Sequence, residues 1–158
     1  MYKLFVDLDG VLADFDRGVL DLTGSLPADL HPKRMWPRIA RANGFYEHLN
    51  WMQDGRVLWN AVRERDPVIL TGLPMGSWAE PQKRAWCARE LGTDIPVITC
   101  MSRQKAQKAA ETTPAGTTMV LIDDREKLRE PWEAAGGMFI LHRSAESSIA
   151  ELKRAGVL

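Results

Sequence analysis

Cysteine and long apolar segments are both scarce in this chain. Cys87 and Cys100 are the two cysteines among 158 residues, too few for a disulfide framework and not spaced as a metal-binding C-x-x-C pair. No segment approaches the roughly 20 consecutive apolar residues that a membrane-spanning helix needs. The opening segment MYKLFVDLDG has the pattern of a buried strand and not of a secretion signal. We therefore expect a cytoplasmic protein without membrane contacts.

A surplus of charge of either sign is lacking as well. Lysine plus arginine and aspartate plus glutamate number 21 each, so no global basic field exists to attract a nucleic acid polymer. Hydrophobic residues make up 45% of the chain, a share that lets a protein of this length bury a sizeable core. We expect a single domain over residues 1–158. The oligomeric state stays open, with a homodimer as one alternative.

Five short apolar runs predict the strands of a sheet. The runs are continuous rather than alternating, as expected for a parallel sheet that helices cover on both faces. Strand–helix alternation predicts an α/β doubly wound fold with a mainly parallel, five-stranded sheet. The predicted strands lie at 3–8, 67–70, 95–99, 118–122 and 138–141. The predicted helices that follow the later strands lie at 79–91, 103–111, 126–135 and 144–155.

The interval between the first two predicted strands is too long for one crossover helix. It contains helical patterns of its own at 15–22, 35–49 and 55–65, and three of the six tryptophans. We predict that residues 16–66 form a small helical cap inserted after the first strand.

Polar side chains gather where the predicted strands end. In open α/β sheets, ligands bind beyond the carboxyl ends of the strands, so these residues are expected to converge on one edge. Several carboxylates held a few ångströms apart repel one another, and a hard cation such as Mg²⁺ would offset that repulsion. A hydroxyl and an ammonium group suit the oxygens of a phosphate. The converging residues are Asp7, Asp9, Thr71, Gly72, Lys105, Asp123 and Asp124.

The segments that carry these residues resemble the motifs of a known family. VDLDGVLADF at 6–15, ILTGLP at 69–74 and VLIDDREK at 120–127 are similar to three motifs of the haloacid dehalogenase (HAD) superfamily of phosphatases. A lysine near the third strand corresponds to the remaining motif. Within this superfamily, the chain most resembles the 5′(3′)-deoxyribonucleotidase branch. The resemblance is specific at the motifs and loose in the inserted segment.

The resemblance implies a Mg²⁺-dependent phosphatase with an aspartyl-phosphate intermediate. It implies that Asp7 is the nucleophile and a metal ligand. Asp9 is the general acid and then the general base, and its backbone carbonyl also binds the metal. Asp124 completes the metal site, and Asp123 supports it.

The phosphate site departs from the family pattern at one position, and the identity of its lysine is open. The resemblance implies that Thr71 and a lysine hold the phosphate. The related branch places serine after that threonine, whereas this chain has Gly72, so one hydroxyl is replaced by backbone. We favour Lys105 over Lys108 as the phosphate lysine. We expect Lys83 to be a surface residue, with a place near the phosphate, as in some members of the resembling family, as the alternative.

The expected substrate is a small phosphomonoester, and we favour a deoxynucleoside monophosphate. The resembling nucleotidases place an aromatic side chain at the position of Phe15, facing the base, and Phe45 and Trp51 are expected to add substrate-binding surface. Trp36 and Tyr46 are further aromatic candidates in the insert. Two alternatives stay open. One is a phosphatase for sugar phosphates or other small phosphomonoesters, and the remote one is a receiver-like signalling domain that accepts phosphate on an aspartate.

Overall fold

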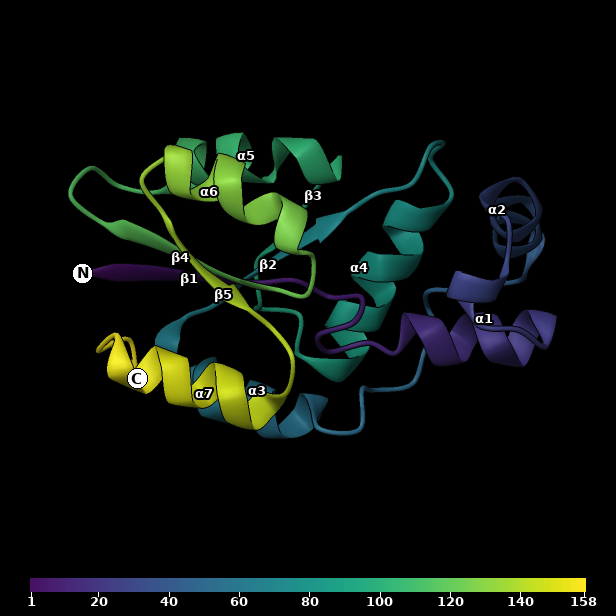
Figure 1. Cartoon of the computed structure of the whole chain (residues 1–158), viewed down its shortest axis with the longest axis horizontal. Coiled ribbons are helices and arrows are strands. Elements are labelled where there is room, and N and C mark those ends of the chain that lie inside the picture. Colours follow the sequence, from purple (N-terminus) through teal and green to yellow (C-terminus); the bar gives the residue numbers. More distant parts are fainter.

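The computed structural model describes all 158 residues and is built on a five-stranded, all-parallel sheet (Figure 1). The strand order is β3-β2-β1-β4-β5, so the first strand lies in the middle. The predicted α/β doubly wound fold is therefore confirmed. The strands are β1 (Tyr2–Val6), β2 (Val68–Gly72), β3 (Val97–Cys100), β4 (Thr118–Asp123) and β5 (Met138–Leu141).

Helices cover both faces of the sheet because successive strand residues point to opposite sides. Val6, Ile69 and Val120 belong to one buried cluster, which also holds residues of α3 (Gly55–Val62), α4 (Ala79–Glu90) and α7 (Ala145–Arg154). The intervening strand residues pack on the opposite face against α5 (Lys105–Thr112) and α6 (Arg129–Ala134). Figure 1 shows α5 and α6 on one side of the sheet, with α3 and α7 on the other. None of the helices has both the length and the apolar character needed to cross a membrane.

The first strand is shorter than predicted, which changes how its carboxylates are placed. β1 ends at Val6, so Asp7 and Asp9 lie in the loop that follows. The Asp7 amide still donates to the Ile122 carbonyl at 3.0 Å, which extends the contact with β4 by one residue. Gly10 has a φ of 80°, and this left-handed conformation turns the chain toward the insert.

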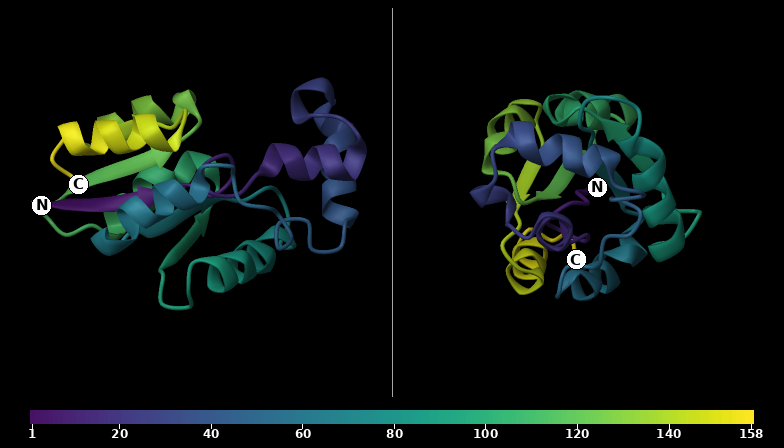
Figure 2. Two further views of the ribbon diagram at one scale, coloured as in Figure 1. Left: turned by 90° about the horizontal axis from the view of Figure 1, so that it is seen from below. Right: turned by 90° about the vertical axis from the view of Figure 1, so that its right-hand side faces the viewer.

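The insert consists of two parts that lie in different places. Helices α1 (Phe15–Thr23) and α2 (Pro32–Arg41) project beyond the sheet, at the end away from both termini (Figure 2). Helix α3 instead returns to the sheet and packs beside α7. The projecting part of 16–66 is therefore α1, α2 and the turns that follow them.

The predicted helix at 35–49 is wrong at both ends. Helix α2 begins three residues earlier, where Pro32 occupies the first helical turn and the His31 ring accepts a hydrogen bond from the Lys33 amide at 3.1 Å. It ends at Arg41, and turns follow, with Gly44 at a φ of 68°. Short 3₁₀ helices at Pro27–Asp29, Arg63–Arg65, Ser102–Gln104 and Glu126–Leu128 complete the structure.

Candidate active site

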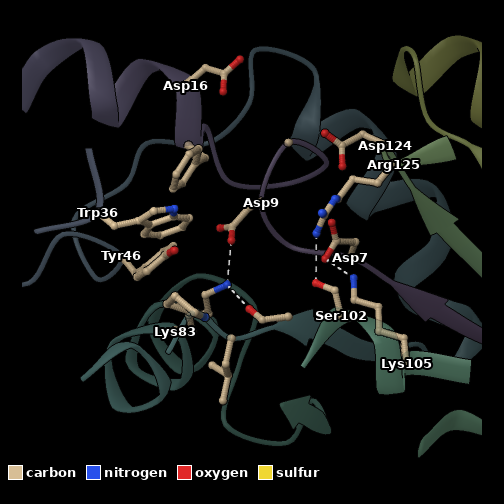
Figure 3. Close-up of a pocket in the computed structure, with 15 residues that line it drawn as sticks. Asp7, Asp9, Asp16, Trp36, Tyr46, Lys83, Ser102, Lys105, Asp124 and Arg125 are labelled. Atoms are coloured by element: carbon tan, nitrogen blue, oxygen red, sulfur yellow. Dashed lines mark hydrogen bonds and ion pairs between the residues drawn. The ribbon is translucent and has the colours of Figure 1, made fainter. Parts of the chain in front are cut away.

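A pocket of about 310 Å³ opens at the carboxyl edge of the sheet, facing the insert (Figure 3). This volume lies in the range of small-molecule sites. Loops after four strands and the first helices of the insert contribute its walls. The residues that line it are Asp7, Asp9, Gly10, Phe15, Asp16, Trp36, Tyr46, Gly72, Leu73, Pro74, Lys83, Ser102, Lys105, Asp124 and Arg125.

Three carboxylates form a cluster on one side of the pocket. One oxygen from each of Asp7, Asp123 and Asp124 lies within 4.8 Å of the others. The buried Lys105 ammonium donates to Asp7 Oδ1 and to Asp123 Oδ2, both at 2.7 Å. The second oxygen of Asp123 accepts the Arg125 amide at 3.0 Å. Asp123 thus has both oxygens engaged, while Asp7 Oδ2 accepts no hydrogen bond and the Asp124 carboxylate accepts none from any other residue.

Burial and crowding of negative charge shift the pKa values of Asp123 and Asp124. Burial and the charge of Asp7 raise the pKa of Asp123 to about 6. Partial burial of its carboxyl and the charges of Asp7 and Asp123 raise the pKa of Asp124 to about 7, although solvent around this exposed residue screens part of the effect. Burial disfavours the charged form of Lys105, but the two contacting carboxylates outweigh it and raise its pKa. One ammonium does not neutralise three carboxylates.

The cluster fits a hard divalent cation. Oxygen ligands from a few carboxylates are what Mg²⁺ takes in protein sites, and Asp7 and Asp124 both have free oxygens. The chain also makes room for this arrangement at Gly10, where a Cβ atom would stand 2.2 Å from Asp124 Oδ2. Any side chain at position 10 would displace the carboxylate, so glycine is needed both for its positive φ and for this close approach.

The cluster predicts an unusual pH dependence of stability. Because the pKa values of Asp123 and Asp124 are raised on folding, these two carboxyls bind more protons in the folded protein than in the unfolded chain, and their contribution to the stability of metal-free protein should grow as the pH falls from about 8 to about 5.5. Burial lowers the pKa of His142, which opposes part of this gain at the acidic end of the range. At pH 8 the ionised cluster should bind Mg²⁺, so added Mg²⁺ should raise Tm most there. Thermal melts with Mg²⁺ or chelator measure both effects.

Asp124→Asn is the control and should lose most of the Mg²⁺ response. A larger Mg²⁺ response at pH 5.5 than at pH 8 would contradict the metal site.

A second lysine lies at the centre of the site, contrary to the sequence prediction. Lys83 is 1% exposed rather than on the surface. Its ammonium donates to Asp9 Oδ2 at 2.6 Å, to Thr71 Oγ1 at 3.0 Å and to the Gly72 carbonyl at 2.6 Å. It also lies 4.4 Å from the centre of the Tyr46 ring. The sequence carried a signal for this position, since Lys83 shares a helical face with the buried Ala79, Trp86 and Cys87 of α4.

Asp9 has one oxygen without any partner. Its Oδ2 accepts a hydrogen bond from the Lys83 ammonium, but Oδ1 is buried and accepts no hydrogen bond. Burial raises the pKa of Asp9, the charge of Lys83 lowers it, and the charge of Asp7 raises it further, with a net upward shift. A buried, unpartnered carboxylate oxygen favours the protonated acid, so Oδ1 is the atom on which Asp9 would carry a proton.

Thr71 does not line the pocket, contrary to the sequence prediction. It is fully buried beneath the floor, where its hydroxyl accepts from Lys83. Gly72 does line the pocket. Of the two lysines considered near the third strand, only Lys105 reaches the carboxylates. Lys108 is on the surface and pairs with Glu111 at 3.2 Å.

Aromatic side chains form the opposite wall. The Phe15 ring lies 6.0 Å from Trp36 and 6.1 Å from Tyr46, measured between ring centres, and all three line the pocket. Figure 3 shows Trp36 and Tyr46 on one side, Asp9 in the middle, and Asp7 with Lys105 on the other. Phe45 lies behind Phe15, edge to face at 5.7 Å, and is excluded from the pocket lining.

The structure places Trp51 away from the pocket, which corrects its predicted role. Its indole N–H donates to Glu90 at 2.9 Å, and its ring lies 5.1 Å from that of Trp86. The Arg56 guanidinium covers the ring at 4.6 Å. Trp51 thus packs the loop before α3 against α4 and does not contact a ligand in the pocket.

Comparisons with known proteins bear on the fold. No family model matches the chain, and no curated protein matches it. Among solved structures, the crystal structure of a hydrolase from Streptococcus pneumoniae TIGR4 is similar over 99% of this chain and 98% of its own length. The TM-score is 0.56 and the identity is 14%. The two chains share a fold. At this identity the similarity concerns the arrangement of sheet and helices and does not extend to the activity.

Proposed function

We propose that this protein is a Mg²⁺-dependent phosphomonoesterase that forms an aspartyl-phosphate on Asp7. The proposal rests on three carboxylates at one pocket, those of Asp7, Asp124 and Asp9, each of which is placed for a different role. Lys105 holds Asp7 Oδ1, which leaves Oδ2 free to attack. Asp124 offers a free carboxylate beside it. Asp9 has a raised pKa and a buried oxygen able to carry a proton. The solved hydrolase of the same fold and the motif resemblance add support.

The residues divide the reaction into two displacements. In the first, Asp7 Oδ2 attacks phosphorus, the bond from phosphorus to the ester oxygen breaks, and Asp9 gives its proton to that oxygen. In the second, water attacks phosphorus, the bond to Asp7 breaks, and Asp9 takes a proton from the water. Asp7 and Asp124 would hold Mg²⁺, with Asp123 behind them, and the bound ion would offset repulsion between carboxylate and phosphate.

The strand order argues against the receiver-like alternative. Receiver domains of the CheY type have the doubly wound order 2-1-3-4-5. Here the order is 3-2-1-4-5, and helices are inserted between β1 and β2. We therefore keep the phosphatase and drop the signalling domain.

We further propose a nucleotide as the substrate, because an aromatic wall faces the carboxylates. Stacking of a base on an aromatic side chain contributes roughly 1–3 kcal/mol. Phe15 and Tyr46 are largely covered, whereas Trp36 retains 36% exposure at the pocket mouth. A base that extends from a phosphate at Asp7 would meet this wall (Figure 3).

Replacement of Trp36 with alanine should raise KM for a deoxynucleoside monophosphate by roughly fivefold or more, from the lost stacking energy. The rate with a small alkyl phosphate should not change, because that substrate does not reach the wall. Phe15→Ala should have the same selective effect, though it also removes buried packing. The exposed Tyr2→Ala, at the far end of β1, is the matched control. Equal losses with both substrates would contradict base stacking.

A panel of phosphomonoesters tests the proposed function. Release of phosphate is measured with nucleotides, sugar phosphates and alkyl phosphates, each with Mg²⁺ and with excess chelator. We expect hydrolysis only with Mg²⁺, and fastest hydrolysis of nucleotides. If sugar phosphates are cleaved faster than every nucleotide, the nucleotidase assignment is wrong and the phosphatase stands. Full activity in chelator would remove the metal from the mechanism.

A further inference from the structure

Gly72 and Ser102 share one space at the edge of the sheet. Gly72 ends β2 and pairs in register with Cys100, the last residue of β3, and Ser102 follows two residues later. A Cβ atom on Gly72 would stand 2.3 Å from Ser102 Oγ. The φ of Gly72 lies outside the left-handed region, so backbone conformation does not require glycine there, and glycine weakens a strand. The space it leaves is filled by the Ser102 hydroxyl.

The Ser102 hydroxyl has a proton to donate. Its Oγ accepts a hydrogen bond from Arg125 Nη1 at 3.0 Å, and its own O–H has no acceptor within the protein. Arg125 forms no ion pair, so its remaining guanidinium donors are also unused by carboxylates. Ser102 carries the only aliphatic hydroxyl among the residues that line the pocket, since Thr71 lies beneath the floor.

The lysines of the site have few donors left for an anion. All three ammonium hydrogens of Lys83 have acceptors in the protein, namely Asp9, Thr71 and the Gly72 carbonyl. Lys105 uses two of its three on carboxylates. A phosphate beside Asp7 needs donors of its own. Figure 3 shows Ser102 and Arg125 next to Asp7, on the side of the pocket opposite Trp36 and Tyr46.

We propose that Ser102, oriented by Arg125, is a phosphate-binding residue that donates its hydroxyl proton to a phosphate oxygen, and that Gly72 is present to make room for it. The proposal rests on the proposed phosphatase function, which supplies the phosphate at Asp7. The ligand class is a phosphate group, either of the ester or of the inorganic product.

Paired substitutions at positions 72 and 102 test this proposal. Binding of inorganic phosphate is measured by titration calorimetry in the presence of Mg²⁺, together with kcat/KM for a phosphomonoester. Ser102→Ala should weaken phosphate binding and lower kcat/KM by roughly tenfold, as for a lost hydrogen bond to a charged group. Gly72→Ser alone should be impaired and less thermally stable, because its side chain would collide with Ser102.

The double variants separate the hydroxyl from the space it occupies. Gly72→Ser with Ser102→Ala removes the collision and places a hydroxyl on the neighbouring strand, so phosphate affinity should return to within a fewfold of wild type. Gly72→Ala with Ser102→Ala removes the collision without restoring a hydroxyl, and should stay as weak as Ser102→Ala. Ser77→Ala, an exposed serine of the β2–α4 loop that makes no side-chain hydrogen bond, is the control and should match wild type.

Two results would overturn the proposal. One is wild-type phosphate affinity in Ser102→Ala. The other is equal phosphate affinity of the two double variants, because then the hydroxyl contributes nothing. Failure of the proposed function is a different outcome, in which wild type with Mg²⁺ cleaves no phosphomonoester. The calorimetric ranking of the variants still decides the role of Ser102 in that case.

Discussion

Replacement of Asp7 with asparagine should abolish phosphate release while the protein stays folded. The amide has nearly the same shape but is not a nucleophile, and losses for a residue of this kind are on the order of 10⁴-fold or more. Folding should survive because Lys105 keeps Asp123 as its partner and the cluster loses one repelling charge. The measurement is kcat with an aryl phosphate, alongside thermal melting by circular dichroism.

The control for this variant is Asp29→Asn, an exposed aspartate of the insert far from the cluster in sequence, which should keep full activity. Asp7→Asn that melts normally and retains more than about a tenth of wild-type activity would exclude Asp7 as the nucleophile, because covalent catalysis does not survive loss of its nucleophile at that level.

Replacement of Asp9 with asparagine should slow turnover by roughly 10²–10⁴-fold, the usual contribution of general acid–base catalysis. The loss should be larger for an alkyl phosphate than for an aryl phosphate, because an alkoxide needs the proton from Asp9 more than a phenolate does. Lys83 keeps Thr71 and the Gly72 carbonyl as acceptors, so its position should hold. Kinetics with both ester types measure the effect, and Mg²⁺ affinity is followed in parallel. Equal losses with both esters, or a near-normal rate, would remove the acid–base role.

The sheet could be predicted from the sequence because its signal is local. Each strand is a short apolar run that contributes to the clusters on the two faces of the sheet, and the five runs appear at nearly the predicted positions. Residues that directly follow β1 and β4 were therefore placed at the correct edge. Asp7, Asp9 and Asp124 meet there, and Lys105 reaches Asp7 from the start of α5.

The insert and part of the site depend on contacts between distant segments, which one sequence does not reveal. The helical pattern continues past Arg41, but the chain turns near Gly44 and places Tyr46 rather than Phe45 in the pocket. The Trp51 indole donates a hydrogen bond to Glu90 on α4, a helix that comes later in the chain. The space that Ser102 takes beside Gly72 likewise depends on the pairing of β2 with β3.

Chemical trapping would detect the covalent intermediate on Asp7. The protein is mixed with substrate and Mg²⁺, quenched during turnover, and treated with borohydride, which reduces an acyl phosphate to the alcohol. Peptide mass spectrometry then locates the reduced residue. We expect homoserine at position 7 in wild type and none without substrate or in Asp7→Asn. Active enzyme that yields no reduced aspartate, or yields one at Asp9 or Asp124 instead, would contradict the intermediate on Asp7.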